Sequence, residues 1–296
     1  MMLDFQKITT YPISQRQNKF QLKDMIPLDN QRQIDDDNLQ QVADAILASK
    51  KQGGKVMIML GGAVVKTGCS LLLIDLMQKG FIDHIAVNGA VSIHDFEIAL
   101  IGETSEDVER GLEDGTFGMV EETGRMLNEA ISDGHQSGNG YGKAVGKKIA
   151  DLDLPHKSAS LFYNAVKMNI PITVHVAVGG DIIHQHPTCD GAALGGTSYR
   201  DFQILTESVS KLAGGALLNI GSAVNLPEVF LKALTIARNL QFDVREFTTA
   251  NFDFFDMYRP RTRLLEWPRK LGCVGWDVRA DHADSIPTLH YHLVRA

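Results

Sequence analysis

Apolar residues follow two spacings along the chain, and these spacings predict its helices and strands. Residues 37–52 fit an amphipathic helix that ends at Gly53. Its apolar residues stand at the i, i+3, i+4, i+7, i+8 positions: Leu39, Val42, Ala43, Ile46 and Leu47. Residues 55–60, KVMIML, form a short and almost wholly apolar run. Such a run is typical of a strand that is buried in a parallel sheet.

The same alternation continues toward the C-terminus. Further strands are predicted over 84–88, 172–178, 216–220 and 243–247. Helices are predicted over 71–79, from Thr104 onward with Asp107 as a weak capping partner, over 199–212, and from about Pro227 to Asn239. Repeated strand, loop and helix units predict an α/β fold with a mostly parallel sheet and helices on both faces.

The predicted organisation is one domain behind an arm. Residues 1–36 are polar and Gln-rich without clear periodicity, so we interpret them as an N-terminal arm. This arm either packs on a neighbouring subunit or is a partly disordered tail. Residues 37–296 contain no linker and are predicted to form a single domain. Within it, the glycine-rich residues 134–142 are expected to form a flexible loop or lid.

Composition narrows the range of partners. With Lys+Arg 29 and Asp+Glu 36, the net charge is 29 − 36 = −7, which disfavours nucleic acid as a partner. Cys69, Cys189 and Cys273 lie far apart and no CxxC occurs, so neither a disulfide framework nor a cysteine zinc site is indicated. The chain shows no signal-peptide pattern and no apolar run of roughly 18 residues. We therefore expect a soluble, cytoplasmic protein without a membrane segment.

Ligands of open parallel sheets bind beyond the carboxyl ends of the strands. Four loops expected at that edge are rich in small or polar residues: 61–68 (GGAVVKTG), 88–95 (NGAVSIHD), 179–196 (GGDIIHQHPTCDGAALGG) and 219–225 (NIGSAVN). Glycine allows a backbone to approach a ligand closely, and amides at helix starts favour phosphate. The sequence contains no GxGxxG and no Walker A motif, and such loops are more often tight turns. Spacing alone therefore points only weakly to a dinucleotide.

Six segments between Val56 and Val294 resemble, in the same order, segments of the deoxyhypusine synthase family. They are GGAVVKTGCSLLLIDLMQKGFIDHIAVNGAVSIHD, DGAALGG, KLAGGALLNIGSAVNLPEVFLKAL, TTANFDFFD, MYRPRTRLLEWPRK and VRADHADSIPTLHYHLV. The resemblance implies a Rossmann-like sheet, NAD as cofactor, and a homotetramer with clefts between subunits. It also implies a transferase that moves an aminobutyl-type group from a spermidine-like polyamine to an amine acceptor, which is a protein lysine or a free amine.

The resemblance assigns substrate binding to five residues. Asp190 matches the aspartate of the family's DGSLGD, and Asp253 and Asp256 match those of its DGSD. Paired carboxylates would offset the lost hydration of a dication in a dry cleft. Trp267 matches the tryptophan that packs along the aliphatic chain, and Glu266 stands close to a substrate-binding acid of the family. The alternatives are a turn residue for Asp190, helix caps or surface pairs for the other aspartates, and a core role for the tryptophan.

The family's catalytic lysine is displaced in this sequence. Its WGK becomes WPRK, which puts Arg269 in the place of the lysine and Lys270 one position later. Because arginine stays protonated and cannot form an imine, Lys270 is the candidate nucleophile, with a surface charge as the alternative. Lys66 in the first glycine-rich loop is another lysine expected near the cofactor.

The family's histidine beside its GGGVVK segment is also missing here. His184 or His186 is the candidate acid or base in its place. The same HxH, followed by Cys189 and Asp190, could ligate a metal, but polar loop histidines are the favoured reading and no metal is predicted.

The resemblance also transfers contacts to NAD. They fall on Thr67, Gly68, Asn88, Gly89, Asp95, Gly221, Ser222, Thr248, Thr249, Ala280 and Asp281. Asp281 could bind a ribose hydroxyl pair, a role that acids play in dinucleotide sites.

Three rival functions stay open. The first is an NAD-dependent amine oxidoreductase or homospermidine-forming enzyme that needs no lysine imine. The second is a non-catalytic oligomer that binds NAD or a polyamine. The third is a metal hydrolase built on His184, His186 and Asp190.

Overall fold

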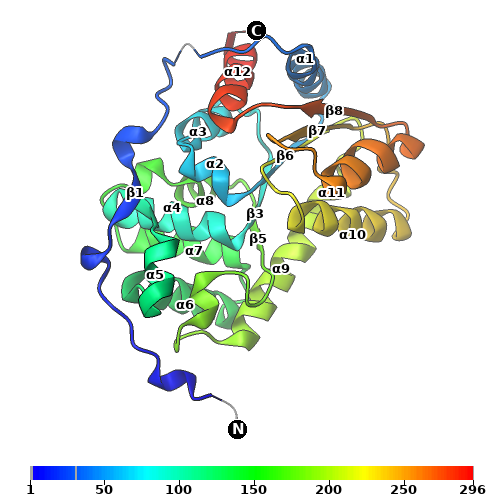
Figure 1. Cartoon of the computed structure of the whole chain (residues 1–296). Helices are drawn as coiled ribbons and strands as arrows, with labels where there is room; N and C mark the ends of the chain where they lie inside the picture. Colours follow the sequence, from blue (N-terminus) through cyan, green and yellow to red (C-terminus); the bar gives the residue numbers. More distant parts are fainter. Residues whose placement is uncertain (1–2, 31, 296) are drawn as a thin grey trace.

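In the computed structural model, residues 3–30 and 32–295 are described, and they form a Rossmann-like α/β fold (Figure 1). Within these residues a six-stranded parallel sheet has the order β5-β3-β2-β6-β7-β8. Its strands are β2 (Val56–Leu60), β3 (His84–Asn88), β5 (Ile172–His175), β6 (Ala216–Ile220), β7 (Thr248–Phe252) and β8 (Val274–Val278). A separate antiparallel pair joins β1 (Asn18–Gln21) to β4 (Glu103–Glu106). The predicted fold class is confirmed.

The strand order defines where a ligand crevice belongs. Numbered along the chain, the strands of the parallel sheet stand in the order 3-2-1-4-5-6, the order of dinucleotide-binding folds. β2 pairs with β3 on one side and with β6 on the other, so the path of the chain reverses between β2 and β6. Ligands of such sheets bind at this switch point, beyond the carboxyl ends of the strands. Here that point lies beside Leu60 and Ile220.

Helices cover both faces of the sheet (Figure 1). Ile58 and Leu60 of β2 face one core, whereas Met57 and Met59 face the other, because side chains alternate along a strand. The first core packs against α1 (Asp37–Lys51), α3 (Ser70–Gln78) and α12 (His282–Arg295). The second packs against α9 (Gly191–Val209) and α10 (Asn225–Asn239).

The other helices lie around these layers. They are α2 (Gly62–Lys66), α4 (Gly89–Ile101), α5 (Val108–Asp114), α6 (Glu121–Gln136), α7 (Tyr141–Asp151), α8 (Leu161–Lys167) and α11 (Tyr258–Pro260). Short turns of helix complete the chain at η1 (Phe5–Lys7), η2 (Ile13–Gln15), η3 (Leu22–Asp24), η4 (Lys157–Ala159), η5 (Ile182–Gln185), η6 (Arg261–Glu266) and η7 (Trp267–Leu271).

Some predicted elements were wrong. Thr104 lies in β4 and pairs with Phe20, whereas the helix α5 begins after its cap Asp107. The strand predicted over 243–247 is in fact β7, which begins at Thr248. β5 ends at His175, short of the predicted Val178, because the chain then turns into a glycine-containing loop. The expected loop or lid over 134–142 is confirmed only over 137–140, since the residues before it end α6 and those after it begin α7, where Tyr141 is fully buried.

The N-terminal arm lies along its own domain. β1 pairs with β4, the amide of Ile26 donates to the carbonyl of Gly68, and Tyr11 forms backbone hydrogen bonds with Met119 and Glu121. Figure 1 shows this segment following the side of the molecule that carries α4 and α5. Backbone hydrogen bonds therefore hold the arm to its own chain, and its packing on a neighbouring subunit stays a prediction. Residues 1, 2 and 31 of the predicted arm lie outside the described residues.

None of the helices within residues 3–30 and 32–295 has the length and the apolar character needed to cross a membrane.

Candidate functional site

Two glycine turns meet at the switch point. The amide of Gly61 donates to the carbonyl of Ile220 at 2.9 Å, and a Cβ added to Gly61 would lie 1.9 Å from the carbonyl oxygen of Gly221. Gly221 has a φ of +68°, and a Cβ there would lie 2.6 Å from Nε2 of His282. The close approach of the two turns therefore requires glycine at both positions, so neither places a side chain in the crevice.

One flank of the crevice, at β7 and β8, carries a buried histidine. His282 opens α12, and its Nδ1 is buried with no hydrogen-bond partner among the described residues. Burial lowers the pKa of His282, while the neighbouring Asp253 and Asp281 raise it. The thiol of Cys69 donates to the carbonyl of His282 at 3.5 Å and also contacts the hydroxyl of Thr67. The fold thus brings together predicted cofactor and substrate residues at this flank: Thr67, Gly68, Gly221, Asp253 and Asp281.

The opposite flank encloses a cavity of about 200 Å³, which we call the α2–α4 pocket. Its lining includes Lys66 at the end of α2, His94 on α4 and Asp181 after β5. A Cβ added to Gly62, in the turn after β2, would lie 3.5 Å from Cδ2 of His94. The pocket therefore adjoins the crevice at the switch point.

A chain of hydrogen bonds fixes the protonation of His94. The hydroxyl of Thr104 donates to Oε2 of Glu97 at 2.5 Å, so its oxygen accepts the proton on Nδ1 of His94 at 2.8 Å. This assignment leaves Nε2 of His94 as an acceptor, with no hydrogen-bond partner among the described residues. Burial lowers the pKa of His94 to about 4, so the ring is neutral at pH 7. His94 is thereby held as a neutral base beside the crevice.

An arm residue anchors this chain of hydrogen bonds. Nη1 of Arg16 donates to Oε1 of Glu97 at 2.8 Å, and the two side chains are only 4% and 1% exposed. The hydroxyl of Thr123 donates to the same oxygen. Breaking a buried ion pair typically destabilises a protein by about 3–5 kcal/mol, so this pair fastens the arm to α4 and holds Glu97 in place.

Asp181 is a buried carboxylate at the pocket wall. Burial raises its pKa to about 6. Nδ1 of His184 accepts the amides of Gly179 and Asp181, which places the ring proton on Nε2, 3.7 Å from the Asp181 carboxylate. Nδ1 of this predicted acid or base is thus bonded within the loop, whereas its buried Nε2 lies near Asp181 and has no hydrogen-bond partner among the described residues. A bound cation would supply the strong partner that Asp181 lacks among the described residues.

Other predicted residues hold the fold. His186 is 3% exposed, and its Nε2 contacts the carbonyl of Gly118 at 2.7 Å, away from His184. Asp190 caps α9 by accepting the amides of Ala192 and Ala193. Among the described residues no group of three or more histidine, cysteine, aspartate or glutamate side chains could hold a metal. The HxH sequence therefore does not form the metal site considered above.

Two acids that were predicted to bind a polyamine have cations of their own. Asp256 pairs with Arg261 at 2.7 Å and with Arg279 at 3.1 Å, which holds its pKa below the usual range. Glu266 lies 3.7 Å from Arg261. Trp267 is 46% exposed and carries the guanidinium of Arg263 over its ring, 4.4 Å from the centroid. The chain's own arginines thus occupy the places expected for a polyamine.

Lys270 lies at the other end of the sheet. It belongs to η7, and the carbonyl of its neighbour Leu271 accepts the amide of Glu246, just before β7 begins. Lys270 is therefore at the amino ends of β7 and β8, whereas the crevice is at their carboxyl ends. A five-residue strand spans about 16 Å, so Lys270 does not reach the crevice of its own chain.

The residues predicted to contact the cofactor fall into two groups, those whose side chains are used inside the fold and those that lie at strand ends. Both oxygens of Asp95 accept hydrogen bonds from Ser160 and the first amides of α8, and the hydroxyl of Thr249 donates to Leu264, so these two side chains face inward. Asn88 caps α4, and a Cβ on Gly89 would lie 2.0 Å from Asp181. The rest lie at strand ends: Ser222 follows β6, Thr248 begins β7 at the amino edge, and Ala280 follows β8.

Several groups at this site were not selected from the sequence as acting residues. His94 was included only as part of the loop 88–95, and Arg16, Asp181 and His282 were not singled out. The available signal was the position of His94 and Asp181 in loops that follow predicted strands. Arg16 gave none, because it meets Glu97 only in the folded chain.

Part of the chain matches a known family. Residues 40–184 match an ArgZ-like domain. This family is defined by the C-terminal, Rossmann-fold domain of ArgZ-like arginine dihydrolase. The matched residues contain β2, β3 and β5 together with His94 and Asp181. Ornithine cyclodeaminase of Methanothermobacter thermautotrophicus is 24% identical over 147 residues, which are 48% of this chain and 32% of that protein. The chain thus spans about a third of this relative's length.

Solved structures share the fold at low identity. AgrE in complex with ornithine and NAD+ has a TM-score of 0.57 at 15% identity, covering 89% of this chain and 34% of that chain. A candidate deoxyhypusine synthase from Entamoeba histolytica has a TM-score of 0.52 at 12% identity, covering 88% of each chain. These likenesses extend to the fold alone. The deoxyhypusine synthase family is one of several with this fold and is not singled out.

Proposed function

We propose that this chain is an enzyme that binds NAD in the crevice between β2 and β6 and oxidises a cationic amine in the α2–α4 pocket. The observation that carries the proposal is the juxtaposition of a 3-2-1-4-5-6 switch point with a pocket that holds the neutral base His94. The complex of AgrE with ornithine and NAD+ supports the pairing of this fold with these two ligand classes.

The residues at the switch point fit a dinucleotide. Gly61 and Gly221 place no side chain in the crevice, and the buried Nδ1 of His282 lacks a partner among the described residues. One departure concerns the ribose, because Asn88 stands at the end of β3, where such folds often carry an acid. When bound, the nicotinamide would accept a hydride from the substrate.

The pocket offers opposite charges to a substrate that carries both an ammonium and a carboxylate. Asp181 would pair with the ammonium, and this pairing would restore the ionised form that burial disfavours. Lys66 would pair with the carboxylate, which favours an amino acid such as ornithine over a simple polyamine. In the oxidation, RR′CH–NH3+ would become RR′C=NH2+. A hydride leaves the carbon, and Nε2 of His94 takes the proton from the nitrogen. Glu97, acting through Thr104, would stabilise the imidazolium that forms.

The test is to mix the purified protein with NAD+ and either L-ornithine or spermidine, and to follow the absorbance of reduced nicotinamide. We expect reduction with L-ornithine and a higher melting temperature with NAD+. An unchanged melting temperature at saturating NAD+ would remove the cofactor assignment. Binding of NAD+ without reduction by any primary amine would remove the oxidation.

Transfer of an aminobutyl-type group is the second candidate. The position of Lys270 at the amino edge favours a direct route without a lysine intermediate. An acceptor amine would attack the imine carbon of the oxidised donor, the old carbon–nitrogen bond would break, and the rest of the donor would leave as a free amine. The hydride that left the donor would return to the new imine, so no net reduction would accumulate. Incubation with NAD+, spermidine and 1,4-diaminobutane, followed by mass spectrometry for a new polyamine, tests this candidate. Homotetramer formation also stays a proposal, which sedimentation analysis can check.

A further inference from the structure

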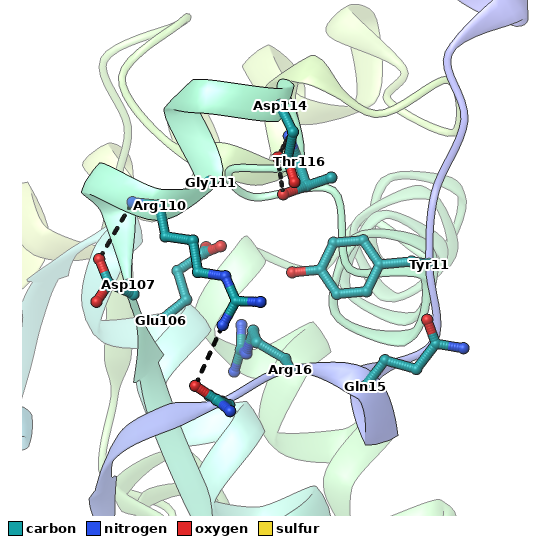
Figure 2. Close-up of a pocket in the computed structure, with 10 residues that line it drawn as sticks. Tyr11, Gln15, Arg16, Glu106, Asp107, Arg110, Gly111, Asp114 and Thr116 are labelled. Carbon is teal, nitrogen blue, oxygen red and sulfur yellow. Dashed lines mark hydrogen bonds between the residues drawn. The ribbon is translucent and has the colours of Figure 1, made fainter.

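A second cavity lies between the N-terminal arm and α5, and neither the crevice nor the α2–α4 pocket includes it. We call it the arm pocket. Its volume is about 290 Å³, and its lining includes Tyr11, Arg16, Glu106 and Arg110. Figure 2 shows the side chains of Tyr11, Arg16 and Arg110 converging on the middle of this cavity. Ligand pockets start at about 300 Å³, so a small metabolite is the size of ligand that fits.

The arm pocket contains donors that the fold does not use. Nη2 of Arg16 is buried and has no hydrogen-bond partner among the described residues, although Nη1 and Nε of the same group are bonded to Glu97 and Asn18. Its side chain is 4% exposed. Among the residues that the structure describes, the guanidinium of Arg110 has only a long contact of 3.4 Å to Gln17. These groups offer N–H donors to a carboxylate, which guanidinium binds in a bidentate manner.

The same cavity contains an acceptor for a cation. Oε2 of Glu106 accepts the amide of Gly118, and its other oxygen has no partner among the described residues. Burial raises the pKa values of Glu106 and of Tyr11, whereas Arg16 lowers both, as expected for groups that face one another. The other acids of the lining are already engaged, since Asp107 pairs with Lys19 and Asp114 accepts from Thr116.

We infer that the arm pocket is a binding site for a free α-amino acid. The ligand carboxylate would bind Arg110 and Nη2 of Arg16, and its ammonium would bind Glu106. A simple anion would meet the carboxylate of Glu106, and a polyamine would meet two guanidinium groups, so only a zwitterion satisfies both signs of charge. This inference does not rest on the proposed oxidation.

Arg16 and Glu106 line both this pocket and the α2–α4 pocket. Arg16 also holds Glu97, the acid that orients His94 through Thr104. An amino acid bound to Nη2 of Arg16 would therefore act on the same guanidinium that anchors the candidate base. The arm pocket is thus placed to sense a metabolite and to influence the neighbouring site.

The experiment is a thermal-shift screen of the full chain with the standard L-amino acids, followed by calorimetric titration of the best ligand. Its deamino and decarboxy analogues, which each lack one charge, serve as the matched ligands. We expect at least one amino acid to bind, and each analogue to bind at least about tenfold more weakly. If no amino acid raises the melting temperature, or if an analogue binds as well as its parent, the inference is overturned.

Variants locate the bound molecule. Arg110→Gln changes an exposed group of the lining and should weaken binding at least about tenfold. Lys23→Gln removes a charge from the arm outside the lining and should leave binding unchanged. Lys66→Gln should leave binding at the arm pocket unchanged and should weaken only a ligand that binds in the α2–α4 pocket. Binding that survives Arg110→Gln but fails in Lys66→Gln would place the amino acid in the other pocket and refute this site.

Discussion

The amino and carboxyl edges of the parallel sheet carry similar polar residues, but these residues differ in how fully the protein satisfies their hydrogen bonds. At the amino edge a cavity of about 430 Å³ is lined by groups that include Lys55, Asp83 and His84. Asp83 accepts hydrogen bonds from two lysines, and both nitrogens of His84 are bonded to Ser208 and Thr173. At the carboxyl edge, His94, Asp181 and His282 each keep an atom that the described residues do not satisfy. The larger cavity, at the amino edge, therefore has polar side chains that are already hydrogen-bonded within the protein. Polar atoms without a partner identify the candidate functional site better than cavity volume does.

The largest expected effect comes from removing the base at the carboxyl edge. His94→Gln should lower kcat for amine oxidation about a hundredfold or more, because glutamine cannot take the substrate proton. The Kd for NAD+ should stay within a few fold. Steady-state kinetics and calorimetric titration measure the two quantities.

His135→Gln is the matched control, since His135 is exposed on α6 outside the site. A His94→Gln protein that keeps near-normal kcat would show that another group is the base.

A smaller effect is expected at Asp181, whose carboxyl group differs in pKa between the folded and the unfolded protein. Asp181→Asn should raise the KM for the amine about tenfold, because the ammonium loses its charged partner. It should also change the pH dependence of stability. Burial raises the folded-state pKa of Asp181 to about 6, whereas an unfolded aspartate titrates near 3.9. Between these values the folded state binds more protons, so the free energy of unfolding falls by up to about 1.4 kcal/mol per pH unit as pH rises.

The Asn variant lacks this slope. Its free energy of unfolding should therefore gain on that of the wild type from pH 4 to pH 6. Urea titrations at several pH values would reveal the change, with the exposed Asp44→Asn as control. Parallel curves for Asp181→Asn and the wild type would contradict the assignment.

The smallest effect is expected at the amino edge. Lys270→Ala should change kcat by no more than about twofold and stability by less than about 0.5 kcal/mol, because the lysine is exposed and remote from the crevice. Borohydride treatment during turnover should trap no substrate on this lysine. A large loss of activity would mean that Lys270 reaches the crevice of another copy of the chain.

The core of the fold could be predicted from the sequence, since β2, β3 and β6 are buried on both faces, so β2 is wholly apolar and β3 and β6 each contain at least three apolar residues in succession. β7 was missed because its buried Asn251 bonds to Asn219 and Asp277 on the neighbouring strands, which makes a central strand look polar. The candidate site was predictable only as an edge of the sheet. Its base depends on Thr104, Glu97 and Arg16, which come from three separate segments and show no common pattern.

The packing of α1 against α12 has a consequence for biosynthesis. α1 precedes every strand of the main sheet, yet it contacts β8 and α12, which follow all the other strands and helices described here. The side chain of Asn38 donates to the carbonyl of Asp277, and the amide of Ile34 donates to Thr288. During translation, part of the apolar face of α1 therefore stays uncovered until β8 and α12 have been made. Such a nascent chain would depend on chaperones until its release.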